Sequence, residues 1–190
     1  TPRFRGSLDP DATLSVTING GPATAIPVSA GAWVYFPAAL ESGRYTFSFV
    51  ATDAAGNESP ATTYSLTVDT VPPVAPVIAA VLDNVSPVIG GIGNGGSTND
   101  PTPTFSGTVE SSATLSVAIN GGLPSVVPVS GGSWTYPPAS LPNGNYTFSF
   151  VATDAAGNVG AATAYALSID TAAPMLTGVA AISLSGSYGI

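Results

Sequence analysis

The run YTFSFVATDAAGN occurs twice without a change, at residues 45–57 and 146–158. It defines a repeat of 101 residues, and residues 1–70 align without a gap to residues 102–171 with 42 identical positions. A repeat of this kind indicates an array of similar units. Within the run, aromatic residues and Ala alternate with Thr, Ser and Val at a period of two, which indicates a half-buried strand. The sequence therefore predicts a tandem array of β modules.

Composition also favours an all-β fold. The chain has 22 Gly and 18 Pro, and only 7% of its residues are charged. Short strands between Gly- and Pro-rich turns are typical of sandwiches and barrels. Cysteine is absent, so no disulfide connects the strands. A bound metal ion is the alternative means of stabilising the fold. No apolar run approaches the roughly 20 residues that span a bilayer, and we expect no membrane insertion.

The repeat divides the chain into three predicted parts. Residues 1–70 form a copy without a beginning, residues 71–171 a complete module, and residues 172–190 the start of a different module. The first copy has no counterpart of residues 72–101, so we expect it to lack its first strand and to expose a sheet edge. Because the chain opens in mid-repeat, we expect it to be part of a longer protein.

The complete module has seven predicted strands separated by turns of Gly, Asn, Pro and Asp. Seven short antiparallel strands in about 100 residues are typical of an immunoglobulin-like sandwich. The predicted strands are residues 75–82, 102–109, 114–119, 126–129, 133–136, 146–153 and 163–169.

A short motif supports this fold. Tyr45 and Tyr146 each follow a Leu and a Gly at fixed spacing, as LESGRY and LPNGNY. The spacing resembles the tyrosine corner of immunoglobulin-like domains, in which the Tyr hydroxyl bonds back to the preceding turn. Trp33 and Trp134 are predicted to pack in the cores.

The charged residues exclude several functions. All three basic residues lie in the first 44 positions, and eight acids but no base follow from residue 45 onward. A polyanion would be repelled, so nucleic acid is not an expected partner. The chain has no His, Cys or Lys to act as a base or nucleophile, and we expect no enzymatic activity.

Acidic residues of the complete module are predicted to gather at one end. Chain direction alternates in an antiparallel sandwich, which places Asp83, Asn99, Asp100 and Asp170 at the same end. Carboxylate and amide oxygens are the ligands that Ca²⁺ prefers, whereas zinc and copper favour His and Cys. The sequence therefore predicts a calcium site there. The alternative is that these residues only form turns and solvate loops.

Three further acids are candidate ligands. Asp53 and Asp154 begin the loop after each identical run, and each either only closes this loop onto its own backbone or also reaches the next module. Asp69 begins a linker, residues 69–76, with three prolines that restrict its flexibility.

The combination of VATDAAGN, VDT or IDT before AP, and a Gly-rich stretch ending TNDPTPTFSGT resembles the bacterial Ig-like repeat of large biofilm-associated surface adhesins. The resemblance implies type I secretion, an extracellular location, calcium at module ends and a spacer role. By position, Asp83, Asp100, Asp154 and Asp170 match acidic positions of that repeat. The first copy lacks equivalents of Asp83 and Asp100.

Two main functional hypotheses remain open. The first is a calcium-stiffened spacer of a cell-surface adhesin that supports adhesion and biofilm formation. Its partners are neighbouring modules and, through other domains, host or matrix glycans or proteins. The alternative is a carbohydrate- or protein-binding module, or an ancillary module of a secreted enzyme. Binding requires exposed aromatic side chains, which otherwise pack in the core. The candidates are Tyr35, Phe36, Tyr136 and Tyr165.

Overall fold

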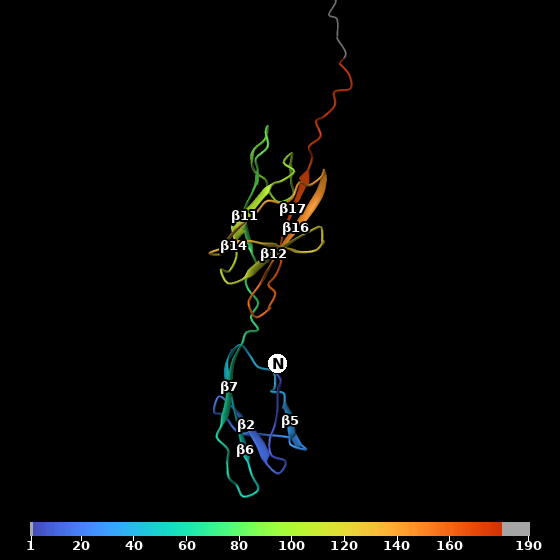
Figure 1. Cartoon of the computed structure of the whole chain (residues 1–190). Helices are drawn as coiled ribbons and strands as arrows, with labels where there is room; N and C mark the ends of the chain where they lie inside the picture. Colours follow the sequence, from blue (N-terminus) through green and yellow to red (C-terminus); the bar gives the residue numbers. More distant parts are fainter. Residues whose placement is uncertain (1, 180–190) are drawn as a thin grey trace, which may run out of the picture. The chain divides into compact units, whose positions relative to one another are not determined.

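The computed structural model describes residues 2–179, and every regular element in this range is a β-strand (Figure 1). The described chain separates into two compact units. The first comprises residues 2–73 with the loop Thr153–Gly160, and the second comprises Val74–Ala152 with residues 161–179. No described helix is long and apolar enough to cross a membrane. Residues 171–179 contain no strand, and the rest of the predicted third part lies outside the described residues.

The second unit is a sandwich of two five-stranded sheets. One sheet has the order β14-β15-β11-β8-β9, and the other has the order β10-β17-β16-β12-β13. The strands are β8 (Val77–Asp83), β9 (Gly90–Gly91), β10 (Gly96–Thr98), β11 (Thr104–Thr108), β12 (Thr114–Ile119), β13 (Ser125–Val127), β14 (Val129–Ser130), β15 (Ser133–Tyr136), β16 (Gly144–Thr153) and β17 (Thr163–Ile169).

The first unit has a smaller version of the same two sheets. Their orders are β1-β5-β4 and β3-β2-β6-β7, which match β11-β15-β14 and β13-β12-β16-β17 of the second unit. Counterparts of β8, β9 and β10 do not occur in the described part of the first unit. The strands are β1 (Phe4–Ser7), β2 (Thr13–Ile18), β3 (Thr24–Ile26), β4 (Val28–Ser29), β5 (Ala32–Tyr35), β6 (Gly43–Thr52) and β7 (Thr62–Val68).

The two-sheet β fold is as predicted, but some strands differ. The stretch predicted as one strand at residues 126–129 is two strands, β13 and β14, which lie in different sheets. Pro128 separates them, and a residue without an N–H cannot continue a hydrogen-bonded ladder. The short Gly-rich strands β9 and β10 were not predicted. In addition, β10 pairs with β17 in parallel, so the unit is not entirely antiparallel.

Aromatic side chains fill the core of each sandwich. In the second unit the Phe105 and Phe148 rings lie 4.3 Å apart, and the Trp134 ring stacks 4.8 Å from Phe150. Trp134 is buried, which confirms its predicted place, while Trp33 is only partly buried against the first core.

Both predicted tyrosine corners form. The Tyr45 hydroxyl donates to the Glu41 carbonyl oxygen at 3.1 Å, and the Tyr146 hydroxyl donates to the Pro142 carbonyl oxygen at 2.8 Å. Each bond spans four residues and fixes the turn that leads into the long strand β6 or β16. The prediction from the Leu, Gly and Tyr spacing is therefore confirmed in both units.

Candidate functional site

Three strands of the second unit end close together. Asp83 is the last residue of β8, Thr98 is the last residue of β10, and Asp170 follows β17. Because β10 runs parallel to β17, both strands finish at the same end of the sandwich. The Asp170 backbone N–H donates to the Thr98 carbonyl oxygen at 2.9 Å, which joins the two strand ends. Acids that are distant in the sequence thus converge at this end.

A hydrogen-bonded group that we call the carboxylate clasp connects β8 to β10. It consists of Asp83, Thr98 and Asp100. The Thr98 hydroxyl donates to Asp83 Oδ2 at 2.6 Å and accepts from the Asp100 backbone N–H at 3.0 Å. All three residues are buried, and Asp100 is fully so. Buried carboxylates are stable only when donors replace their lost water, and the clasp supplies such donors.

Backbone amides satisfy the remaining oxygens of the clasp. Asp83 Oδ1 accepts from the Val85 N–H at 2.7 Å. Asp100 Oδ1 accepts from the Thr102 N–H and hydroxyl at 2.8 and 3.0 Å, and its Oδ2 accepts from the Asn84 N–H at 3.2 Å. Asp and Thr side chains commonly close local turns in this way. Both carboxylates therefore have a structural role independent of any ligand.

Asp170 fixes the chain where it leaves the last strand. Its Oδ1 accepts from the Ala172 N–H at 3.0 Å and from Asn143 Nδ2 at 3.3 Å. Asn143 Oδ1 in turn accepts from the Thr171 N–H and hydroxyl at 3.1 and 2.8 Å. Unlike the clasp carboxylates, Asp170 is exposed to solvent.

A hollow of about 550 Å³ lies at this end of the second unit. Asp83, Asn99 and Asp170 line it together, whereas Asp100 does not. The described residues contain no group of three or more acids, His or Cys in metal-binding proximity. Two carboxylates and one side-chain amide thus line the hollow. Calcium binds oxygen ligands of these kinds, and its affinity depends on the number of charged ligands. A calcium role for these residues, and for Asp100, stays a prediction.

The loops at Asp53 and Asp154 have the same structure in both copies. Asp154 Oδ1 accepts from the Ala156 and Asn158 N–H groups, both at 2.9 Å, and its Oδ2 accepts from Asn158 Nδ2 at 2.8 Å. Asp53 makes the equivalent bonds within its own loop. Each carboxylate therefore closes its own turn, and a metal role for it stays a prediction.

Hydrogen bonds to these two carboxylates favour their ionised form. The Asn57 side-chain amide is the largest cause that lowers the pKa of Asp53, followed by the Asn57 backbone N–H. The Asn158 side-chain amide likewise lowers the pKa of Asp154. Asp53 is exposed and Asp154 is partly exposed, so water screens the effect.

Asp69 occupies in the first unit the position that Asp170 has in the second. Its Oδ1 accepts from the Val71 N–H at 3.0 Å, a local turn bond like that between Asp170 and Ala172. The first unit has no described counterpart of Asp83 or Asn99 beside it. The predicted metal role of Asp69 remains a prediction.

Comparison with known families identifies the two sandwiches. A family profile described as bacterial Ig-like domain matches residues 1–70 and 84–171. The chain belongs to this family. Its two units are thus tandem Ig-like β-sandwich modules, as predicted, and modules of this kind are typically non-catalytic. No curated protein matches the chain.

Several solved structures resemble the two Ig-like modules. Fibronectin(III)-like modules of Clostridium thermocellum CbhA are 18% identical, with a TM-score of 0.44, and the match covers 88% of this chain and 85% of that one. The FN1-FN3 domains of chicken CNTN1 are 14% identical, with a TM-score of 0.42 and coverages of 84% and 56%. A 1.5-MDa bacterial ice-binding adhesin is 21% identical, with a TM-score of 0.40 and coverages of 90% and 58%.

The four aromatic candidates for ligand binding have different surroundings in the Ig-like modules. Tyr35, Tyr136 and Tyr165 are partly buried and pack against the cores. Phe36 is 63% exposed, with the Arg3 guanidinium 5.6 Å from its ring centre. The four residues therefore do not share one exposed surface.

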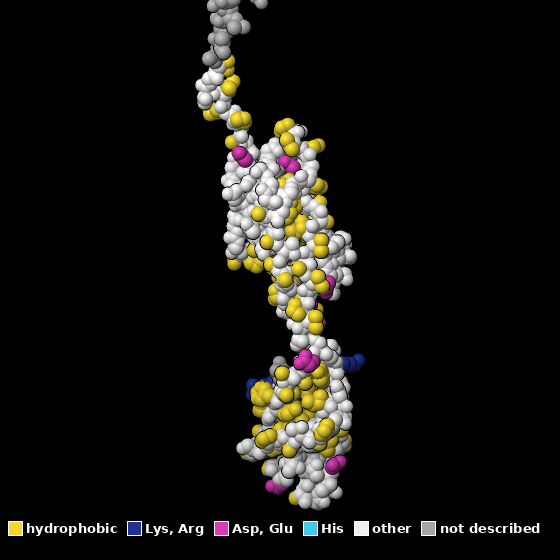
Figure 2. Space-filling model, turned by 180° about the vertical axis from the view of Figure 1, so that it is seen from behind, with side chains coloured by type: hydrophobic (Ala, Val, Ile, Leu, Met, Phe, Trp, Pro, Cys, Tyr) yellow, Lys and Arg dark blue, Asp and Glu magenta, His cyan; other side chains and the backbone are white. Residues whose placement is uncertain are grey.

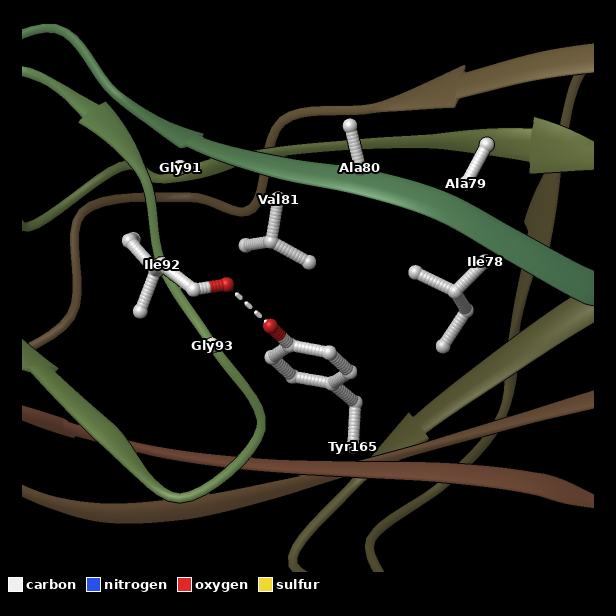
Figure 3. Close-up of a pocket in the computed structure, with 8 residues that line it drawn as sticks. All are labelled: Ile78, Ala79, Ala80, Val81, Gly91, Ile92, Gly93 and Tyr165. Carbon is white, nitrogen blue, oxygen red and sulfur yellow. Dashed lines mark hydrogen bonds between the residues drawn. The ribbon is translucent and has the colours of Figure 1, made fainter.

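Two hydrogen-bonding contacts of the second Ig-like module were not predicted from the sequence. Thr98 connects both clasp carboxylates, and the only sequence signal was a Thr placed two residues before an Asp. Tyr165 donates its hydroxyl to the Ile92 carbonyl oxygen across a hollow of about 370 Å³, as Figure 3 shows. Burial raises the pKa of Tyr165, which keeps the hydroxyl proton available for this bond.

Proposed function

We propose that this chain is a spacer segment of a large bacterial cell-surface adhesin, located outside the cell and supporting adhesion and biofilm formation. The supporting observation is that two consecutive modules match the bacterial Ig-like family and share the strand orders β1-β5-β4 and β3-β2-β6-β7 with their counterparts. Modules in series set the distance between other parts of a protein without any chemistry of their own. The partners of this segment are neighbouring modules, and host or matrix glycans or proteins are bound through other domains.

The proposal includes a calcium site at the end of the second module. Asp83, Asn99 and Asp170 line one hollow, and Asp170 Oδ2 accepts no hydrogen bond among the described residues. Two carboxylates and an amide, completed by backbone carbonyls and water, are suited to calcium at the millimolar affinity of extracellular modules. Asp170 lies where the last strand leaves the sandwich, so calcium there would restrain residues 170–174.

A calcium titration followed by thermal unfolding tests the metal part. For a dissociation constant of about 1 mM, 10 mM calcium stabilises the second module by roughly 1.4 kcal/mol, which raises its Tm by several degrees. Magnesium at the same concentration serves as the ionic control, because it requires a smaller and more regular ligand shell.

Substitution of two equivalent acids locates the site. We expect Asp170→Asn to abolish the calcium response. Asp69→Asn changes the same position of the first module, where the described residues offer no second carboxylate, and it should leave the response intact. An equal loss in both variants, or no response in the unaltered chain, would refute a calcium site in this hollow.

The spacer role is tested by replacement in the full adhesin. An unrelated sandwich pair of the same length should preserve adhesion, whereas deletion of the pair should reduce it. Loss of adhesion on replacement would instead favour a binding module. A glycan array probed with the two modules would then identify a carbohydrate ligand.

A further inference from the structure

The chain enters and leaves the second unit at opposite ends of its last strand. The Pro76 carbonyl oxygen, directly before β8, accepts from the hydroxyl of Thr163, the first residue of β17, at 2.5 Å. Asp170 follows the other end of β17, where the chain leaves the sandwich. The entry and the exit are therefore separated by the length of β17. Tension that pulls the two ends of this unit apart acts along that strand.

One strand pair connects the entering segment directly to the leaving strand. Residues 77–98 contain β8, β9 and β10, and of these described strands β10 is the one that pairs with β17. The pairing is parallel, with Gly96 opposite Leu167 and Thr98 opposite Ile169. Tension at the entry pulls β10 toward its first residue, and tension at the exit pulls β17 toward its last. The two strands are thus loaded in shear, and the evenly spaced bonds of a parallel pair share the load.

Backbone hydrogen bonds extend this pairing at both ends. At the exit, the Asp170 N–H donates to the Thr98 carbonyl oxygen at 2.9 Å. Toward the entry, the Gly95 N–H donates to the Ala166 carbonyl oxygen at 2.8 Å, and the Ala166 N–H donates to Asn94 Oδ1 at 2.8 Å. We call residues 92–98 and 165–170 the shear joint. Its bonds follow one another along the strands, so sliding requires that they break together.

A buried side chain also opposes sliding of the two strands. Figure 3 shows the Tyr165 hydroxyl directed at the Ile92 carbonyl oxygen, to which it donates. The Ile92 side chain is buried in the same core cluster as Leu167 and Ile169 of β17. Movement of β10 past β17 would break the hydroxyl bond and draw Ile92 out of the core. Exposure of this apolar surface to water adds to the resistance of the joint.

The carboxylate clasp transmits tension from β8 to the shear joint. Asp83 is the last residue of β8, and its Oδ2 accepts from the Thr98 hydroxyl at the end of β10 at 2.6 Å. Tension on β8 therefore reaches β10 through this bond as well as through the intervening loop. Both residues are buried, so water does not compete for the bond.

We propose that the shear joint is the mechanical clamp of the second unit, which sets the force at which the unit unfolds when its entry and exit are pulled apart. The inference concerns this unit alone and depends neither on the spacer role nor on calcium. Figure 2 shows acidic side chains at the exit end of the unit, drawn in the upper half. Its test is therefore made with a calcium chelator present, so that only protein contacts are measured.

Stretching single molecules in two geometries tests the proposal. The chain has no cysteine, so two introduced cysteines are the only attachment sites for the handles of optical tweezers. The pair Val74→Cys and Ala172→Cys, at exposed positions outside the entry and exit, loads the joint in shear. The pair Asn99→Cys and Ala172→Cys follows the ends of β10 and β17, so it peels the strands apart one bond at a time. We expect peeling to require roughly half the shear force or less, because each bond then carries the whole load.

Two Tyr→Phe substitutions form a matched pair for the shear geometry. Each removes one hydroxyl bond to a carbonyl oxygen in the same unit. Tyr165→Phe removes a bond that must break before β10 slides, so it should accelerate unfolding at constant force roughly fivefold. Tyr146→Phe removes a bond outside the joint and should change this rate by less than about twofold. Asn94→Ala, at an exposed position, should act like Tyr165→Phe, because it removes the acceptor of the Ala166 N–H.

Either of two results would overturn the proposal. Equal unfolding forces in the shear and peeling geometries would show that the direction of load on β10 and β17 does not matter. Equal acceleration by Tyr165→Phe and Tyr146→Phe would show that the joint resists force no more than the rest of the unit. Neither result would bear on the calcium titration or on the replacement of the module pair in the adhesin, so failure of this inference is distinguishable from failure of the proposed function.

Discussion

The two units share most of their sequence but differ in how completely their cores are closed. Phe105 and Phe150 are fully buried in the second unit, while the equivalent Phe4 is only partly buried and Phe49 retains 8% exposure. The pairwise aromatic geometry is nevertheless retained, with the Phe4 and Phe47 rings 4.6 Å apart and the Phe105 and Phe148 rings 4.3 Å apart.

The difference shows that the 70 aligned residues alone do not complete a sandwich. In the second unit Leu167 and Ile169 are buried, whereas the corresponding Leu66 and Val68 of β7 are only partly so. The added burial comes from β8 and β10, which lie outside the aligned 70 residues. Closure of the second core thus depends on a segment that precedes the strands shared by the two copies.

Disruption of β8 should reduce the difference between the two units more than any other change. Val81→Asp places a charge at a site with 2% exposure, and we expect it to destabilise the second unit by about 3 kcal/mol or more. NMR signals of the two indole N–H groups report each unit separately, because Trp33 and Trp134 are the two tryptophans. The second unit should then unfold at a denaturant concentration nearer to that of the first.

A control on the same strand distinguishes core disruption from a general effect of charge. Val77 also lies in β8 but is 55% exposed, so Val77→Asp should change stability by less than about 1 kcal/mol. A similar loss in both variants would mean that β8 contributes through its backbone pairing and not through burial of Val81.

A matched pair of Phe substitutions measures the difference in core closure. Phe105→Ala should destabilise the second unit by about 3–5 kcal/mol, the usual cost for a buried Phe. Phe4→Ala should cost the first unit about 1–2 kcal/mol, because part of its ring already contacts water. Urea unfolding with the two indole probes gives both values. Equal losses would contradict the difference in burial between the two cores.

Sequence periodicity and turn residues were sufficient to predict most of the fold. The identical run predicted β6 and β16, and the Leu, Gly and Tyr spacing predicted both tyrosine corners. The strands β9 and β10 were missed because Gly-rich stretches have low strand propensity and no hydrophobic alternation. Their pairing depends on tertiary contacts with β8 and β17, which local sequence does not encode.

The candidate site was predictable in location but not in detail. Alternating chain direction placed Asp83 and Asp170 at one end, and both line the same hollow. The same reasoning did not separate Asp100, which is buried and bonded to Thr102 and Asn84. Which carboxylates face solvent depends on the direction of their side chains near the short parallel strand β10. The alternating chain direction of the strands does not predict this side-chain direction.

The tyrosine corners should contribute equally to the two units, because their hydrogen bonds do not involve β8, β9 or β10. Tyr45→Phe and Tyr146→Phe each remove one hydroxyl bond to a carbonyl oxygen four residues earlier. Each should destabilise its own unit by about 1 kcal/mol, the usual net value of such a bond. Denaturant unfolding of both variants checks this. A much larger loss in the second unit would mean that the corner and β8 stabilise each other.

The smallest expected difference concerns the two Asp turns. Hydrogen bonds lower the pKa of Asp53 and of Asp154 from the ordinary value of 3.8, so the folded carboxylates release their protons more readily than the unfolded ones. The stabilisation from these bonds is therefore fully present above about pH 4, and it is lost as the pH falls through the lowered pKa of the folded state.

An Asn substitution at both positions removes this pH dependence while keeping a side-chain oxygen for the turn. We expect the Asp53→Asn, Asp154→Asn variant to lose less stability than the unaltered chain between pH 5 and pH 2, roughly the range over which such carboxylates titrate. Above pH 5 the two stability curves should run parallel. Because both loops have the same internal bonds, the two single substitutions should have similar effects on the pH dependence. A response to only one of them would show that this Asp interacts with groups beyond its own loop.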